Sequence, residues 1–418
     1  MFFKLARSSL LNRKYSVLLT LLSVAISTFV LLSIEHIRTE AKASFSKTVS
    51  GVDLIVGART GQLNLLLYSV FHIGNATNNI AWNSYQMLAA NPNVAWSIPI
   101  SLGDSHRGYR VMGTTSDFFT HYRFGEQQAL AFQTGQPFSH PFDVVLGAQV
   151  ARTLGYRPDD TIYLAHGLGH TQFSVHDDRT FKIVGILQAT GTPIDHALYI
   201  SLQGMEALHL NWKEGVKLPG KTISDQDLET LNLTPKTITA AMFGLHSKMA
   251  TFQVQRQIND YRQEPLLAIL PGIALTDLWQ ITRTMEETLQ LIAALVLFSS
   301  LLGLSTLLLA SIRERHHEIA VLRAIGARPA FVFWIIELEA LLITLSGMVL
   351  ALFALLIVTQ SAQTVLAEQY GLFISPFTLN QPALKMLGVI VGGSFLLALI
   401  PAISAYRVSL HSGLAAKH

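Results

Sequence analysis

The stretch Arg313-Glu-Arg-His-His-Glu-Ile-Ala-Val-Leu-Arg-Ala-Ile-Gly-Ala327 separates two long apolar segments of a 418-residue chain. It is rich in arginine, and lysine and arginine concentrate on the cytoplasmic side of membrane proteins. Ile319, Leu322 and Ile325 recur at helical spacing, and Gly326 precedes an Arg-Pro pair, which is a stop and restart signal. The sequence predicts a short amphipathic helix in the cytosol, between two membrane spans and available to a cytosolic partner.

The composition supports a membrane protein. Half of the residues are hydrophobic, 14% are charged, and the mean hydropathy is +0.38. About 20 apolar residues of helix, at about 1.5 Å each, cross the hydrocarbon core of a bilayer. Runs of this kind predict an integral membrane α-helical fold with four transmembrane helices, at residues 15–34, 288–312, 329–360 and 383–405.

Charge counting orients the chain. The segments 1–14, 313–331 and 406–418 together hold ten lysines and arginines against two acidic residues. We therefore expect cytosolic termini, with an amphipathic N-terminal helix at 1–14, a coupling helix at 313–328 and a cytosolic tail at 406–418. A cleaved signal peptide is the alternative for the first apolar run, but that run is longer than the usual hydrophobic region of about 7 to 15 residues.

The segment 35–287 lies between the first and second spans and holds 19 basic and 22 acidic residues, which is typical of a domain outside the cytosol. Short apolar runs alternate with helical stretches and predict a large mixed α/β periplasmic domain with stalk helices at both ends. Polar residues with glycine and proline predict a second subdomain at about 211–265, and residues 361–382 form a short periplasmic loop. The absence of cysteine excludes disulfides and thiolate chemistry.

Two motifs suggest binding of nucleotide or metal. Gly215-Val-Lys-Leu-Pro-Gly-Lys-Thr222 fits the phosphate-loop pattern, but polar sequence stands where the strand before the loop should be, so we do not interpret it as a nucleotide site. His166, His170 and His176 offer nitrogen ligands within eleven residues and are candidates for a zinc site. The glycines between the first two favour a solvated loop instead. Zinc therefore stays possible but unlikely as a cofactor.

Polar residues and glycines within the apolar runs predict helix contacts. Glu337 and Glu339 would be expensive in lipid, so we expect them to face other helices or the cytosolic boundary, with a packing role favoured over a proton or substrate path. Gly388-x-x-x-Gly392 predicts close helix packing within the chain. No arrangement of catalytic residues stands out, so an enzyme is not indicated. No aromatic-rich basic patch suggests nucleic acid.

The segment Glu318-Ile-Ala-Val-Leu-Arg-Ala-Ile-Gly-Ala327, followed by Glu339-Ala-Leu-Leu-Ile343, resembles the MacB, FtsX and LolC type of ABC transporter permease. Val52-Asp-Leu-Ile-Val-Gly-Ala58 and Gly191-Thr-Pro-Ile-Asp-His196 are more loosely similar to the family's external domain, and Pro401-Ala-Ile-Ser-Ala-Tyr-Arg407 to its ending. The order of one span, a large external domain and three further spans extends the resemblance to the whole chain.

The resemblance implies a non-catalytic mechanotransmission permease in the bacterial inner membrane. Its homodimer or heterodimer would work with a separate cytosolic ATPase that uses ATP and Mg, and with a periplasmic adaptor or delivery protein. No cofactor would bind to this chain directly. The coupling helix would contact the ATPase through Glu314, Glu318, Ile319, Leu322, Arg323 and Gly326.

The substrate implied by the resemblance is periplasmic or in the outer leaflet, such as a lipid, lipoprotein, peptide or drug. An FtsX-like signalling module without transport and a zinc-linked trafficking complex are the alternatives. The tail Val408-Ser-Leu-His-Ser-Gly departs from the family's usual ending, because it lacks proline and acidic residues.

Overall fold

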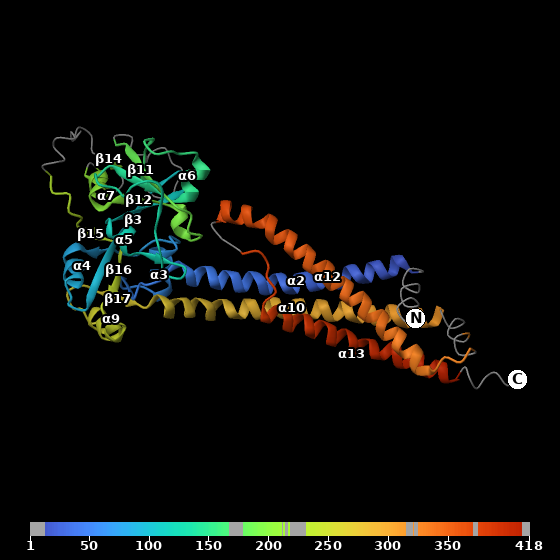
Figure 1. Ribbon diagram of the computed structural model, residues 1–418. Coiled ribbons are helices and arrows are strands. Elements are labelled where there is room, and N and C mark those ends of the chain that lie inside the picture. The colour runs from blue at the N-terminus through green and yellow to red at the C-terminus, as the bar shows by residue number, and fades with distance from the viewer. Residues whose placement is uncertain are drawn as a thin grey trace. The chain divides into compact units, whose positions relative to one another are not determined.

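The structure is a computed structural model, and it describes residues 13–166, 179–210, 212–213, 216–217, 231–314, 321, 325–370 and 375–411. The chain divides into two compact units. We call Met1–Glu40, Arg283–Thr364 and Ile374–His418 the helical unit, and Ala41–Thr282 with Val365–Phe373 the α/β unit. Figure 1 labels their elements.

Four helices are long and apolar enough to cross a membrane. They are α2 (Lys14–Thr48), α10 (Pro271–Glu314), α12 (Pro329–Tyr370) and α13 (Gln381–His411). Two of them begin with proline, which has no N–H to satisfy in the first helical turn. The oxygen Oδ1 of Asn380 accepts a hydrogen bond from the N–H of Ala383 (3.0 Å) and so caps the start of α13. The predicted class of four long apolar helices with a mixed α/β domain between the first and second is confirmed.

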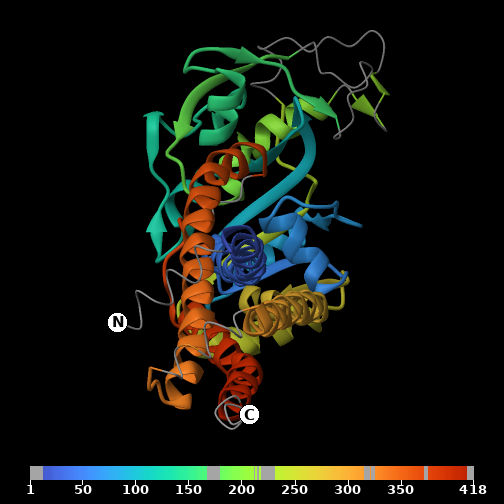
Figure 2. The same cartoon turned by 90° about the vertical axis from the view of Figure 1, so that its right-hand side faces the viewer.

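Apolar side chains form the core of the helical unit, and hydroxyl groups and one glycine mark close contacts between its helices. The hydroxyls of Ser23 in α2 and Ser300 in α10 are 3.0 Å apart. A Cβ built on Gly347 of α12 would lie 3.1 Å from the backbone oxygen of Leu21, so α12 approaches α2 closely there. Figure 2, which looks nearly along α2, shows α10 and α12 on different sides of it.

The expectation for Gly388 and Gly392 does not hold in the described residues. A Cβ added to either glycine of α13 would meet no atom within 4 Å. Close packing within the chain occurs instead at Gly347, which forms a small-residue pair with Ala351 four residues later. The glycine pair therefore presents an open strip of α13.

The α/β unit is built on one sheet that contains 11 strands in the described residues. Its main path is β17-β1-β16-β3-β4-β12-β8-β11-β7, with β10 on β3 and β9 on β11. The strands are β1 (Leu54–Ala58), β3 (Val94–His106), β4 (Tyr109–Thr114), β7 (Phe132–Gly135), β8 (Asp143–Leu146), β9 (Thr161–Ile162), β10 (Ala165–His166), β11 (Phe181–Leu187), β12 (Ala197–Ser201), β16 (Ala240–Leu245) and β17 (Leu266–Ile269).

Shorter elements complete the unit. The helices are α3 (Gln62–Val70), α4 (Trp82–Ala89), α5 (Asp117–His121), α6 (Ala148–Leu154), α7 (Leu202–His209) and α9 (Thr251–Asn259), and β2 (Ile80–Ala81) pairs with β15 (Thr237–Ile238). Gly155 has a φ of 71° directly after α6, a left-handed cap that glycine adopts without strain. The side-chain oxygen of Ser201 accepts from the N–H of Gly204 and caps α7.

The long strand β3 joins the two ends of the sheet. It pairs with β16 through Val94–Ile100 and with β4 through Ser101–His106, and its register shifts between Leu102 and Ser105. In its described residues, the segment 211–265 does not form the separate second subdomain that was expected, because β16 lies between β1 and β3 in the same sheet. The chain thus pairs again with β1, the first strand of the domain. A pairing between residues so far apart in the sequence gives no local sequence pattern from which it could be predicted.

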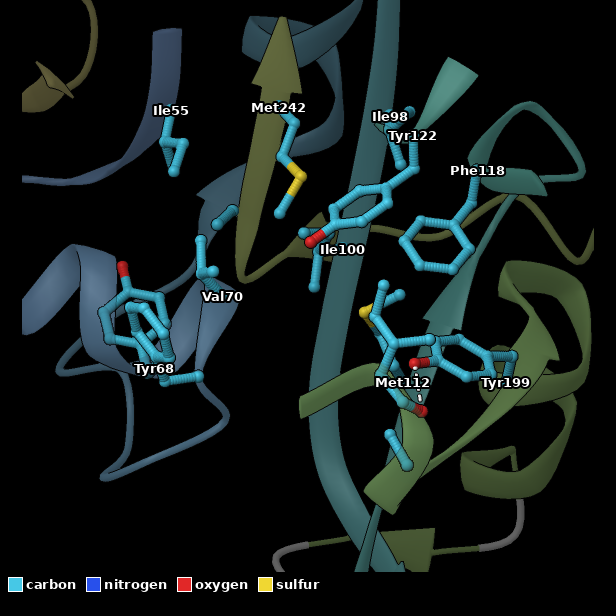
Figure 3. Close-up of a cluster of buried hydrophobic side chains, with 14 of the residues drawn as sticks. Ile55, Tyr68, Val70, Ile98, Ile100, Met112, Phe118, Tyr122, Tyr199 and Met242 are labelled. Atoms are coloured by element: carbon cyan, nitrogen blue, oxygen red, sulfur yellow. Dashed lines mark hydrogen bonds between the residues drawn. The ribbon is translucent and has the colours of Figure 1, made fainter. Parts of the chain in front are cut away.

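Aromatic side chains fill the core between the sheet and the helix α5. Figure 3 shows Phe118, Tyr122 and Tyr199 turned toward one another. The ring of Phe118 lies 5.1 Å from that of Tyr122 and 5.0 Å from that of Tyr199. The hydroxyl of Tyr199 donates to the backbone oxygen of Ile194 (2.9 Å), and that of Tyr122 donates to the backbone oxygen of Thr48. Each buried phenol therefore keeps a partner.

Candidate functional site

The end of α10 bears the first of the residues expected to couple to an ATPase. Glu314 is the last residue of α10, and its Oε2 lies 2.6 Å from Nη2 of Arg13, which also donates to the backbone oxygen of Ser311 (3.2 Å). The Glu314 side chain is 69% exposed, so this ion pair adds little stability. It joins the start of α2 to the end of α10.

The rest of the predicted coupling helix is described only in part. Glu318, Ile319, Leu322 and Arg323 lie outside the described residues. Gly326 has a φ of 95°, which favours glycine, and α12 begins three residues later at Pro329. Val321 and Ile325 are 50% and 76% exposed, so apolar surface remains open on this segment of the chain.

A second group of polar residues joins α2 and α10 beyond their apolar stretches. We call Glu35, Arg38, Glu286 and Gln290 the α2–α10 polar cluster. Oε1 of Glu35 accepts from Nη2 of Arg38 (2.9 Å), and its Oε2 accepts from Nε2 of Gln290 (3.3 Å). Nη1 of Arg38 lies 3.9 Å from Oε2 of Glu286. The Glu35 side chain is only 4% exposed, so this ion pair is largely withdrawn from water.

The segment after α12 also attaches to α2. Nε2 of His36 lies 3.1 Å from the backbone oxygen of Ser375, and Oε2 of Glu40 accepts from the N–H of Ser375 (2.9 Å). The ring of Phe377 packs edge-on against His36 at 5.4 Å. Residues 35–40 of α2, fewer than two turns, thus contact both α10 and the chain that leads into α13.

Glu337 and Glu339 are buried among the helices, with 0% and 2% of their surfaces exposed. Both oxygens of Glu337 have no hydrogen-bond partner among the described residues. The structure thus agrees with the expectation that they face other helices.

Within the apolar part of the helical unit, neutral hydroxyl groups form hydrogen bonds between the helices. The hydroxyls of Thr344 in α12 and Ser394 in α13 are 2.6 Å apart and fully buried, and Oγ of Ser305 in α10 donates to the backbone oxygen of Leu397 (2.8 Å). Hydrogen bonds between neutral side chains link helices without placing charge in lipid.

Only one of the three histidines predicted as possible zinc ligands lies within the described residues. His166 lies in β10, opposite Asp104 of β3, whereas His170 and His176 lie outside the described residues. No group of three potential metal ligands occurs among the residues that the structure describes. Most of the phosphate-loop match at 215–222 is also outside them.

Sequence reasoning missed the α2–α10 polar cluster. A signal was present, because polar residues at helical spacing stand at the same end of both apolar runs: Glu35 with Arg38, and Glu286 with Gln290. Charges at the same depth on two helices can pair. What the sequence lacked was evidence that these two helices are neighbours.

Comparison with known proteins places both units in one family. The description "FtsX-like permease C-terminal" matches residues 291–412, and "MacB-like periplasmic core domain" matches residues 17–261, more than half of the chain. The chain belongs to the MacB/FtsX-type ABC permeases. As in that family, its α/β unit is a periplasmic domain of MacB type carried by a membrane protein.

Individual relatives of this permease are distant. The macrolide export ATP-binding/permease protein MacB of Wolinella succinogenes is 22% identical over 266 residues, which cover 62% of this chain and 37% of that protein. The permease thus spans little more than a third of that relative, and only its permease part.

Two solved structures cover the periplasmic part. The periplasmic region of MacB from Actinobacillus actinomycetemcomitans has 10% identity and a TM-score of 0.33, and covers 57% of this chain and 94% of that one. The extracellular domain of the noncanonic ABC-type transporter YknZ from Gram-positive bacteria has 9% identity and a TM-score of 0.31, and covers 52% and 98%. The assignment of this permease rests on the family matches.

Proposed function

We propose that this chain is the permease subunit of a bacterial ABC system that couples ATP hydrolysis by a separate cytosolic ATPase to movement of its periplasmic domain. It acts on a periplasmic or outer-leaflet substrate such as a lipid, lipoprotein, peptide or drug. A dimer, with itself or with a similar permease, and a periplasmic adaptor complete the assembly. This chain binds no nucleotide.

One observation carries the proposal. The boundaries between the two units fall inside helices, at residue 40 within α2 and at residue 282 within α10. Neither helix is broken at its boundary. A continuous helix transmits displacement along its axis, because each residue adds a fixed rise of about 1.5 Å. Force applied at one end of α10 therefore reaches the periplasmic domain through backbone hydrogen bonds.

The charge distribution supports the proposed orientation. The segments 1–14, 313–331 and 406–418 hold most of the positive charge outside the periplasmic domain. We infer that both termini and the coupling helix lie in the cytosol of a cell with an inner membrane, where ATP is available.

The test exchanges charges on the proposed coupling helix. Glu318→Arg with Arg323→Glu should abolish co-purification of the ATPase and lower ATP turnover, while the amount of permease in the membrane stays unchanged. The matched control exchanges the exposed pair Lys182 and Asp159 of the α/β unit, whose Nζ and Oδ1 atoms are 2.8 Å apart. ATPase binding that survives the first exchange as well as the control refutes the coupling role.

A further inference from the structure

A cavity of about 260 Å³ lies in the α/β unit. It is smaller than the pockets of about 300–1,000 Å³ that hold drug-sized ligands, so its occupant would be a small molecule or one group of a larger one. Its lining comes from the loop after α3, the irregular part of β3, β4 and the residue between β15 and β16. The lining residues are Asn75, Ala76, Asn79, Leu102, Gly103, Asp104, Arg110 and Thr239.

The two charged residues of the lining differ in what they offer a ligand. The side chain of Asp104 is 0% exposed, and its Oδ1 lies 3.5 Å from Nε2 of His209. Burial lowers the pKa of His209, but the hydrogen bond and charge of Asp104, together with the backbone oxygen of Met205 and the charge of Glu206, raise the pKa overall. The carboxylate thus belongs to an internal pair with a histidine. Arg110, which is partly exposed, is the charge that a ligand in the cavity can reach.

Arg110 is held in place by hydrogen bonds and still has N–H donors that are not used. Its Nη2 donates to the backbone oxygen of Gly74 (2.6 Å) and to Oδ1 of Asn75 (3.0 Å). A guanidinium has five N–H donors, and those on Nε and Nη1 have no acceptor among the described residues. Burial lowers the pKa of Arg110, and no carboxylate among the described residues offsets this effect. In that part of the chain, Arg110 is a partly desolvated cation with no acidic side chain bonded to it.

The neutral groups of the lining are also donors. Because Oδ1 of Asn75 accepts from Arg110, the Nδ2 group of the same side chain is left to donate. Oγ1 of Thr239 accepts from the N–H of Leu102 (3.0 Å), so its own hydrogen is available. A cationic fork beside neutral donors is the arrangement that recognises carboxylate or phosphate oxygens.

The loop that supplies Asn75 adopts an unusual backbone. His72 has a φ of 56° and Gly74 a φ of 79°, and a histidine in the left-handed region is uncommon. Arg110 fixes this loop through Gly74. Strained residues of this kind persist where the surrounding structure holds them, often at binding sites.

We call the cavity beside Arg110, Asn75 and Thr239 the Arg110 pocket. We propose that it binds a small oxyanion, the carboxylate or phosphate group of a ligand that reaches the periplasmic domain. The oxyanion accepts from Nε or Nη1 of Arg110, from Nδ2 of Asn75 and from the hydroxyl of Thr239. This site is separate from ATPase coupling, so it can stand if the proposed function fails. A free anion and the phosphate of a lipid headgroup share the required chemistry.

His72 supplies a readout that does not depend on transport. Its pKa is lowered from 6.5 to about 4, first by burial and second by the positive charge of Arg110. An anion on Arg110 opposes the second effect. The ring signal of His72 in NMR should therefore titrate at higher pH once the pocket is filled.

The experiment uses the full chain in phosphatidylcholine nanodiscs, titrated with inorganic phosphate or acetate against chloride at equal ionic strength. A second arm replaces phosphatidylcholine by phosphatidylglycerol without added anion. A saturable rise in the pKa of His72 in the first arm identifies a free anion, and a rise only in the second identifies a lipid headgroup. No rise in either arm, beyond that with chloride, overturns the proposal.

Asn75→Asp is the decisive variant, because it keeps the acceptor that anchors Arg110 and puts a carboxylate where the ligand's would lie. It should raise the pKa of His72 without any ligand and weaken anion binding at least tenfold. Asn91→Asp makes the same change outside the pocket, at a side chain whose Oδ1 accepts from the N–H of Asn93 (3.0 Å). It should behave as the wild type. Equal anion binding by wild type and Asn75→Asp overturns the assignment.

Discussion

Replacing Glu35 by glutamine tests whether the α2–α10 polar cluster stabilises the helical unit. The change removes the charge that pairs with Nη2 of Arg38 at 2.9 Å, and it disturbs the hydrogen bond from Gln290. Hydrogen bonds to charged groups contribute about 1.5–3 kcal/mol, and breaking a fully buried ion pair costs about 3–5 kcal/mol.

The structure favours the lower of these ranges. Arg38 is 34% exposed and keeps Glu286 at 3.9 Å, so it remains partly solvated and partly paired when Glu35 is lost. We expect a loss of about 1.5–3 kcal/mol in the free energy of unfolding, roughly a ten- to hundredfold change in the folding equilibrium.

A double-mutant cycle measures this interaction directly. Glu35→Gln, Arg38→Gln and the double variant are unfolded in mixed micelles, and the coupling free energy should lie at about 1–2 kcal/mol. The matched control is the exposed pair Arg283 and Glu287 on α10, with Nε and Oε1 2.7 Å apart and side chains 73% and 59% exposed. Its coupling should be about 0.3–0.5 kcal/mol. Equal coupling in the two cycles would refute the argument from burial.

Three further outcomes are expected. Thr344→Val should lower stability in micelles by about 0.6 kcal/mol, and by no more than about 1.7, because its buried hydroxyl pair joins two membrane helices. Burial, with the charge of Arg110, lowers the pKa of His72 to about 4, so the folded chain resists protonation there. Thermal stability should fall as the pH drops from about 6.5 toward 4, and less so in His72→Gln. A disulfide between Ser23→Cys and Ser300→Cys should form, since the native hydroxyls are 3.0 Å apart, and leave ATP turnover unchanged.

Local patterns predicted many elements of the α/β unit closely. The apolar run Phe181–Leu187 forms β11 and the stretch Ala148–Leu154 forms α6, so both elements begin and end where the local sequence pattern does. Neighbouring residues alone are enough to predict both elements. For α6, Gly147 and Gly155 mark the two ends, and the apolar side chains between them recur at helical spacing. The apolar run Val94–Ile98 predicts only the first part of β3, which runs to His106.

The arrangement of those elements was not predictable in the same way. The β3 strand continues through a register shift between Leu102 and Ser105, which lets one strand serve both ends of the sheet. The Arg110 pocket forms at this irregularity from segments that are remote in the sequence. No periodicity relates Arg110 to Asn75, so neither residue stood out before the fold was known.

The two connections between α2 and α10 limit how these helices can move. The Ser23–Ser300 contact and the Glu35–Gln290 contact are separated by about 18 Å along α2 and about 15 Å along α10, at about 1.5 Å per residue. Sliding one helix past the other by a turn, about 5.4 Å, would break both contacts at once. Tilting the two as a pair would break neither. In the proposed coupling mechanism, these two contacts therefore favour a movement in which α2 and α10 stay together, and a disulfide between them should leave that coupling intact.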